Sequence, residues 1–161
     1  SLAVARNRTV VAWYTGVDEI LGKPSPEGAV LLRTLQGEGD AAEAPVRIDD
    51  GRPVGRVDLA ALEDGSCVVC WLERKGDGAE VRVRRWRGKE PEGEVPSAHR
   101  LWSSHRIGTT SPGRRSGFPR IIGAGSSSAV VAWTETGVEG GTTVRTVRLP
   151  EIYKETVAEE K

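Results

Sequence analysis

The sequence contains no apolar run that approaches the roughly 18 residues of a transmembrane helix. It also has no excess of either charge, because Lys plus Arg and Asp plus Glu each number 23 among the 161 residues. A balanced chain attracts neither nucleic acid nor an anionic membrane through its overall field. The composition therefore predicts one ordinary globular domain, with no nucleic-acid partner and no membrane span.

Cysteine is scarce, and its only two copies, Cys67 and Cys70, have a C-x-x-C spacing that raises the question of a redox or metal site. Their surroundings are typical of a β-strand, in which side chains three residues apart point to opposite faces of the sheet. Such a pair can neither chelate one ion nor close an unstrained disulfide. We therefore predict two small buried side chains here, with no metal and no cofactor.

A repeated pattern organises the rest of the chain. The motif Val-Val-x-Trp occurs three times, as Val10–Trp13, Val68–Trp71 and Val130–Trp133. Each copy follows a short apolar run and a polar turn, and precedes a variable loop and an Arg-bearing strand. The tryptophans lie 58 and 62 residues apart, which is close to the length of a β-propeller blade with loop insertions.

These repeats predict an all-β fold built from about three four-stranded antiparallel blades of a β-propeller. The 20 Gly and 9 Pro residues fall mostly between the apolar runs, as expected for a protein with many turns. Residues 1–150 form the partial propeller, and residues 151–161 form a charged tail. The predicted blades cover approximately residues 1–50, 56–110 and 118–150.

Two parts of the chain are predicted to depart from a regular four-stranded repeat. Residues Gly16–Gly28 contain so many Gly and Pro residues that they are predicted to be an irregular insertion. The third blade shows only three strands, and a closed ring needs at least four blades. The lone chain is therefore predicted to be incomplete, with further blades supplied by upstream sequence, by another chain or by self-association.

Five strings carry a resemblance to a known family, namely Asp49–Asp58, Asp64–Ser66, Trp71–Glu73, Ser116–Arg120 and Ala132–Glu135. With them, the chain resembles the C-terminal half of bacterial sialidase-like proteins, which are six-bladed β-propellers named for exo-alpha-sialidase activity. The resemblance covers most of residues 1–148. It implies an exported, extracytoplasmic protein. The fold alone implies no activity, which has to be argued from the residues of the site.

The same resemblance supplies a chemical expectation. True sialidases hold the substrate carboxylate with three arginines, and they use a Tyr nucleophile activated by Glu together with an Asp acid/base. Tyr14 is the only Tyr in the repeat region and hence the one candidate nucleophile, although a half-buried Tyr commonly just packs. The chain departs from the family because it lacks the Ser-x-Asp-x-Gly-x-x-Trp box.

Other candidate residues follow from the alignment of the repeats. Asp58 and Arg120 occupy the same place at the entrance of a first strand, so they are predicted to face a ligand, with Arg56 and Arg120 as carboxylate or sulfate contacts. The plainer interpretation is a loop-end ion pair. Glu135 follows its tryptophan by two residues, as Glu73 does, so it is either a base or a structural residue at a strand end.

Trp102 breaks the repeat and is predicted either to stack on a sugar ring or to pack at an edge. Together these observations favour a sialidase-like propeller portion that acts as a module for glycan binding, or for protein interaction, in a larger assembly. The ligand expected is an anionic glycan. The alternative is part of a glycoside hydrolase of exo-sialidase type, whose remaining catalytic residues lie outside this chain.

Overall fold

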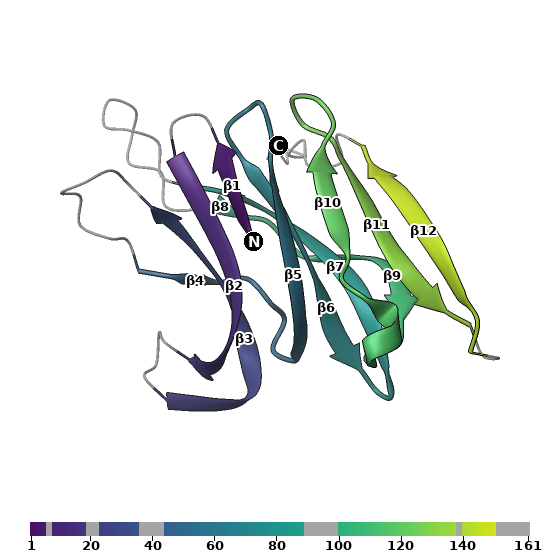
Figure 1. Ribbon diagram of the computed structural model, residues 1–161. Coiled ribbons are helices and arrows are strands. Elements are labelled where there is room, and N and C mark those ends of the chain that lie inside the picture. Colours follow the sequence, from purple (N-terminus) through teal and green to yellow (C-terminus); the bar gives the residue numbers. More distant parts are fainter. Residues whose placement is uncertain (6–7, 19–22, 36–43, 89–99, 138–139, 151–161) are drawn as a thin grey trace, which may run out of the picture.

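The computed structural model describes residues 1–5, 8–18, 23–35, 44–88, 100–137 and 140–150. Within these ranges the chain forms β-strands and one short 3-10 helix, and it contains no α-helix. The strands make three antiparallel sheets that follow one another along the sequence and stand side by side (Figure 1). The all-β prediction is confirmed.

The first sheet has the strand order β1-β2-β3-β4. Its strands are β1 (Leu2–Ala5), β2 (Arg8–Asp18), β3 (Lys23–Leu35) and β4 (Val46–Arg47). Alternation of apolar side chains along β2 places Val10 and Ala12 on one face of the sheet and Trp13 on the other.

The second sheet has β5 (Pro53–Ala61), β6 (Cys67–Lys75) and β7 (Gly78–Arg87) in order. Beyond β7 lie two short strands, β8 (Arg100–Leu101) and β9 (His105–Thr110), which both pair with β7 at different points along its length. The second blade, predicted to have four strands, is therefore a sheet of five.

The third sheet consists of β10 (Arg120–Gly123), β11 (Ala129–Thr136) and β12 (Thr142–Leu149), preceded by the 3-10 helix η1 (Arg114–Ser116). Three strands were predicted here, and three are found among the described residues. The three sheets follow one another in the order of the three predicted repeats, and the second begins at Pro53, three residues before the predicted start of its blade. The predicted tail, residues 151–161, lies outside the described residues.

One prediction about the first sheet is wrong. Gly16–Gly28 was expected to be irregular, yet β2 continues to Asp18 and β3 already begins at Lys23. The two strands change register between Thr15 and Val17 and then pair again. Between the pairs Thr15–Ala29 and Val17–Pro24, β2 has one residue and β3 has four, so the irregularity lies within the Gly- and Pro-containing part of β3. Pairing resumes beyond it, where a proline near the start of a strand removes little of the ladder.

Two apolar cores hold the three sheets together, and the second sheet contributes to both. Trp71 and Val69 pack against Val10 and Ala12 of the first sheet. Cys70 and the residues that share its face of β6 pack instead against the third sheet. Each fully buried Val or Leu in such a core stabilises the fold by about 1.5–3 kcal/mol.

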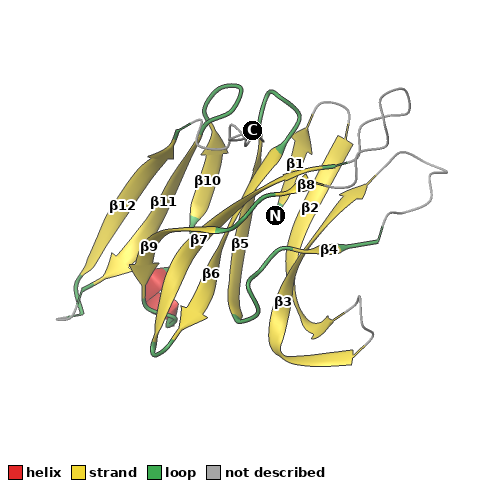
Figure 2. Cartoon of the chain, turned by 180° about the vertical axis from the view of Figure 1, so that it is seen from behind, coloured by secondary structure: helices red, strands yellow, loops and turns green. Residues whose placement is uncertain are grey.

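The packing follows one rule. We call the face that carries the repeat tryptophan, Trp13, Trp71 or Trp133, the tryptophan face of its sheet. In both cores the tryptophan face of a sheet packs on the opposite face of the preceding sheet. The first strands lie together as well, with β5 against both β1 and β10, whereas β4 and β12 lie at the two ends of the structure (Figures 1 and 2).

The two cysteines lie as predicted, on opposite faces of β6. Cys67 faces the first sheet and Cys70 faces the third, and both are buried free thiols. Burial, with the nearby charge of Asp64, raises the pKa of Cys67 to about 12. Burial also raises the pKa of Cys70. Neither thiol supplies a thiolate at neutral pH, so both act as small apolar side chains.

Candidate functional site

A pocket of about 360 Å³ opens between the first and second sheets, where β2 and β6 approach their ends and β5 begins. Its lining combines one aromatic ring, one carboxylate, two guanidinium groups and two apolar residues. These are Tyr14, Glu27, Arg52, Pro53, Val54 and Arg74.

Tyr14 lies against the backbone of two glycines with left-handed φ values. A Cβ on Gly28 (φ 75°) would lie 2.4 Å from the Tyr14 hydroxyl oxygen, and one on Gly55 (φ 85°) would lie 3.1 Å from its Cγ. Only glycine allows both the close approach and the backbone conformation. The ring is thereby held at the pocket while 45% of the residue remains exposed.

Two arginines stand beside this ring. Arg52 Nε lies 3.3 Å from Glu27 Oε2, and both side chains are about half exposed. Arg74 is exposed, and its backbone N–H donates to the Arg52 carbonyl at 2.8 Å. An ion pair this exposed contributes little to stability, so an incoming anion can displace Glu27 from the Arg52 guanidinium at little cost to the fold.

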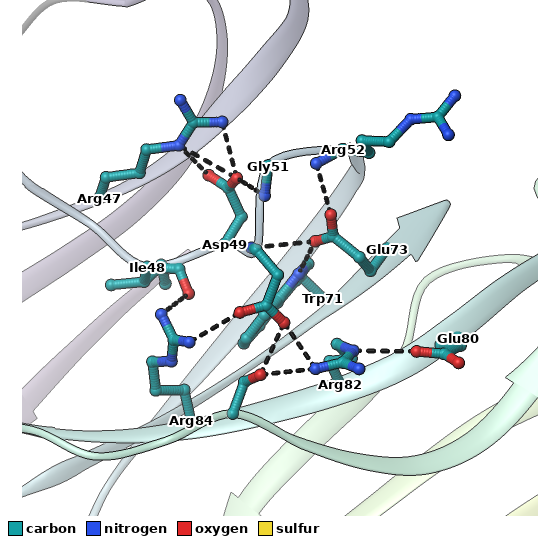
Figure 3. Close-up of polar contacts among 12 residues, drawn as sticks. Arg47, Ile48, Asp49, Gly51, Arg52, Trp71, Glu73, Glu80, Arg82 and Arg84 are labelled. Atoms are coloured by element: carbon teal, nitrogen blue, oxygen red, sulfur yellow. Dashed lines mark hydrogen bonds and ion pairs between the residues drawn. The ribbon is translucent and has the colours of Figure 1, made fainter. Parts of the chain in front are cut away.

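A buried carboxylate fixes the turn that carries Arg52 (Figure 3). The Asp49 carboxylate accepts a hydrogen bond from the Gly51 N–H at 2.8 Å and pairs with Arg47 at 2.8 Å. It also accepts the Val30 N–H at 2.7 Å. These contacts join β3, β4 and the turn before β5. They satisfy a carboxylate whose side chain is fully buried.

A second carboxylate holds the same turn from the other side (Figure 3). Glu73 accepts the Arg52 N–H at 2.5 Å, the Asp50 N–H at 3.3 Å and the Trp71 indole N–H at 2.6 Å. The structural interpretation of Glu73 is thus confirmed, because its oxygens are engaged by backbone and core groups. Arg52 is positioned by Asp49 and Glu73 together.

Asp50 extends the network across the second sheet. It pairs with Arg82 at 2.6 Å and with Arg84 at 2.7 Å, and Ser104 donates to it at 2.6 Å. The Arg84 guanidinium carbon also lies 5.8 Å from the centre of the Trp71 ring, a cation–π distance. The turn before β5 is therefore tied to β6, β7 and the β8–β9 connection.

Asp58 and Arg120, both predicted to face a ligand, are brought together on neighbouring first strands. Arg120 Nε lies 2.9 Å from Asp58 Oδ2, the Ile121 N–H donates to the same oxygen at 3.1 Å, and the Ser1 hydroxyl donates to Oδ1 at 2.7 Å. Arg56 is directed elsewhere, to Ser116 and the Gly117 carbonyl. The predicted trio therefore does not meet at one point.

These contacts set the titration of Asp58. Burial disfavours its charged form, but hydrogen bonds from Ser1, Ile121 and Leu59, together with the charge of Arg120, outweigh burial and hold the pKa of Asp58 below its ordinary value of 3.8. A lowered folded-state pKa means that the unfolded chain binds more protons in acid. Asp58 therefore stabilises the fold above pH 3.8, and this contribution is lost as pH falls through the folded-state pKa.

We expect Asp58→Asn to flatten the acid dependence of stability. The wild-type urea midpoint should fall between pH 6 and pH 3 by more than that of the variant, because the variant has no proton to take up at this position. The matched control is Asp77→Asn, which removes an exposed carboxylate in the β6–β7 turn. Equal acid sensitivity of wild type and Asp58→Asn would refute the assignment.

The remaining candidates lie apart from the Tyr14 pocket. Glu135 bonds to Arg145 at 2.7 Å and lines a separate pocket beside Trp133. Trp102 follows β8, near the end of β7 far from the Tyr14 pocket, and the Arg85 guanidinium carbon lies 5.3 Å from its ring centre. The structure thus distributes the predicted site residues over several places.

The three charged residues of the Tyr14 pocket were not predicted. Arg52 lies within the Asp-Asp-Gly-Arg-Pro string that carries the family resemblance, so a signal for it was present. Glu27 lies in the segment expected to be irregular, and Arg74 lies near the end of β6, where charged residues are ordinary. No pattern in the sequence marks either of these two.

Comparison of the chain with family models, with curated proteins and with solved structures finds no match. Within the described ranges, no cluster of three or more His, Cys, Asp or Glu side chains is arranged to hold a metal ion. The same part of the chain has no helix with the length and apolarity needed to cross a membrane. Functional assignment therefore depends on the geometry of the Tyr14 pocket.

Proposed function

We propose that this chain is part of an exported, sialidase-like β-propeller and that it binds anionic glycans at the Tyr14 pocket. The observation that carries the proposal is an exposed tyrosine ring held beside two exposed arginines in one pocket. An aromatic face suits a sugar ring, and guanidinium groups suit a carboxylate or sulfate.

The construction of the pocket supports a binding role. Its volume of about 360 Å³ falls within the range of roughly 300–1,000 Å³ that small-ligand pockets occupy. Asp49 and Glu73 fix the turn that carries Arg52 without using its guanidinium. A ligand therefore meets groups whose backbone is already ordered, which reduces the entropic cost of binding.

The packing of the sheets supports the propeller component of the proposal. Three antiparallel sheets follow one another, each tryptophan face covers the preceding sheet, and the first strands lie together. Successive blades of a propeller share this relation. In such an assembly the chain supplies three blades and a binding pocket between two of them.

Hydrolysis is the second candidate, favoured by one observation. Tyr14 and Glu27 line the same pocket as the two arginines. A Tyr and a Glu are the residue types of a tyrosine nucleophile and its activating base. Asp58, an Asp that could serve as the acid/base, lies outside this pocket and is engaged by Arg120 on the first strands. Binding therefore ranks above catalysis for this chain.

We expect the double variant Arg52→Ala/Arg74→Ala to weaken binding of a sialylated oligosaccharide by at least roughly tenfold, because each charge-assisted hydrogen bond contributes about 1.5–3 kcal/mol. Titration calorimetry with sialyllactose and with neutral lactose measures the effect. The control is Arg115→Ala, which removes an exposed arginine of η1 outside the pocket and should leave the affinity unchanged.

Two substitutions of Tyr14 test the contribution of its aromatic ring to binding. Tyr14→Phe should retain binding, since the stacking face is preserved, and Tyr14→Ala should lose most of it. A fluorogenic sialoside separates the two candidate functions, because turnover that Tyr14→Phe abolishes would favour the hydrolase. The binding proposal would be rejected if wild type bound neither sialylated, sulfated nor uronic-acid glycans.

A further inference from the structure

Two faces of the described structure are uncovered beside their first strands, and they are of opposite kind. One is the tryptophan face of the first sheet, which is exposed along β1, whereas Leu31, paired with Trp13 on β3, is fully buried. The other is the opposite face of the third sheet. Inside the chain, these same two kinds of face pack on each other twice, between the first and second sheets and between the second and third. The uncovered pair therefore repeats a pairing that the chain already makes.

The first uncovered face is apolar where its counterparts are buried. Leu2 pairs with Val11, just as Leu59 pairs with Val69 and Ile121 with Val131, so Leu2, Leu59 and Ile121 are equivalent. Leu59 and Ile121 are each 5% exposed, but Leu2 is 60% exposed. Trp13 is likewise half-buried, whereas its counterpart Trp71 is fully buried.

The second uncovered face shows the same contrast. Ile122 pairs with Val130, just as Ala60 pairs with Val68. Ala60 is 6% exposed because the third sheet covers it, whereas Ile122 is 65% exposed. Val130 is half-buried, although Val68 at the equivalent place is fully buried. Exposed apolar surface of this kind marks an interface.

We propose that a second copy of this chain covers both faces. The third sheet of one copy packs its uncovered face on the tryptophan face of the partner's first sheet, and the partner returns the same contact. Ile122 then lies against Leu2 and Val4 across the interface, as Ala60 lies against the third sheet within one chain. This inference goes beyond glycan binding and does not depend on it.

A second copy of the chain is the one occupant that matches both faces at once. One chain carries both members of the pairing, so two copies supply each other with what each requires. Such a contact is heterologous, and it closes into a ring when the rotation between copies returns to the start. Closure leaves neither face uncovered, whereas a contact between two like faces would leave the two faces of the other kind exposed.

Native mass tests the inference directly. Light scattering after size-exclusion chromatography is expected to give one species of twice the chain mass. Val4→Lys on the first sheet and Ile122→Lys on the third should each weaken association at least tenfold, because each places a charge in both contacts of the pair. Ser126→Lys, in the exposed turn before β11, is the control and should remain paired.

Mixing the two variants tests the polarity of the contact. A mixed pair of Val4→Lys and Ile122→Lys has one contact free of lysine, so the mixture should associate more strongly than either variant alone. Circular dichroism and tryptophan fluorescence confirm that each variant is folded. A wild-type chain that is monomeric at every concentration, or no gain on mixing the variants, would overturn the proposal. Retained pairing with lost glycan binding would reject only the proposed function.

Discussion

Replacement of Trp71 by Ala is expected to lower the free energy of unfolding by about 3–5 kcal/mol, the range for a buried aromatic side chain. The side chain is fully buried between the first and second sheets. Its indole N–H donates to Glu73 at 2.6 Å, so the substitution also removes one partner of the carboxylate that holds the turn before β5. Urea denaturation followed by circular dichroism measures the loss.

A pair of conservative substitutions separates packing from hydrogen bonding. Trp71→Phe keeps most of the ring volume and removes the bond to Glu73, which should cost about 1–3 kcal/mol. Trp133→Phe removes an indole nitrogen that is buried and has no hydrogen-bond partner among the described residues, so it should cost less. Equal losses from the two substitutions would contradict the importance of the Glu73 bond.

Asp49→Ala is expected to destabilise the fold by about 3 kcal/mol, since removal of one member of a buried ion pair leaves its partners unsatisfied. The substitution strips acceptors from the Val30 and Gly51 N–H groups and from Arg47. Asp49→Asn should cost less, because one side-chain oxygen remains as an acceptor. Thermal and urea unfolding both report the change.

The control for Asp49 is Asp77→Ala in the exposed β6–β7 turn, which should change the free energy of unfolding by less than about 0.5 kcal/mol. Asp49 also links the stability of the fold to ligand binding at the Tyr14 pocket. Because Gly51 precedes Arg52, Asp49→Asn should reduce glycan affinity even where the chain remains folded. A loss below about 1 kcal/mol for Asp49→Ala would show that the turn is held mainly by Glu73.

The strands around the repeat tryptophans were predictable because local pattern and tertiary packing agree there. Val68–Trp71 is apolar at every position, which is the pattern of a strand buried on both faces, and β6 is such a strand. The contact between Asp58 and Arg120 also follows from the repeat. Equivalent positions on neighbouring first strands lie side by side, so residues that align in sequence meet in space.

The features that were not predictable depend on distant partners. The extension of β2 and β3 relies on a register shift that no local pattern encodes, and the β8–β9 division is set by where β7 accepts a partner. Arg56 lies two residues before Asp58, yet its positive φ of 56° leads its side chain to the η1 turn. The Tyr14 pocket combines four separate segments of the chain, which single-segment reasoning cannot assemble.

Burial of the second sheet on both faces has a consequence for how this sequence can vary. Seven consecutive residues of β6, Cys67–Glu73, are buried, so no position in that run offers a side where a larger or more polar side chain is accommodated. Most of β12 is exposed. Mutational tolerance should therefore be lowest in the middle of the molecule and rise towards its last strand, and a library for altered specificity belongs in the turns that flank β6 rather than in β6 itself.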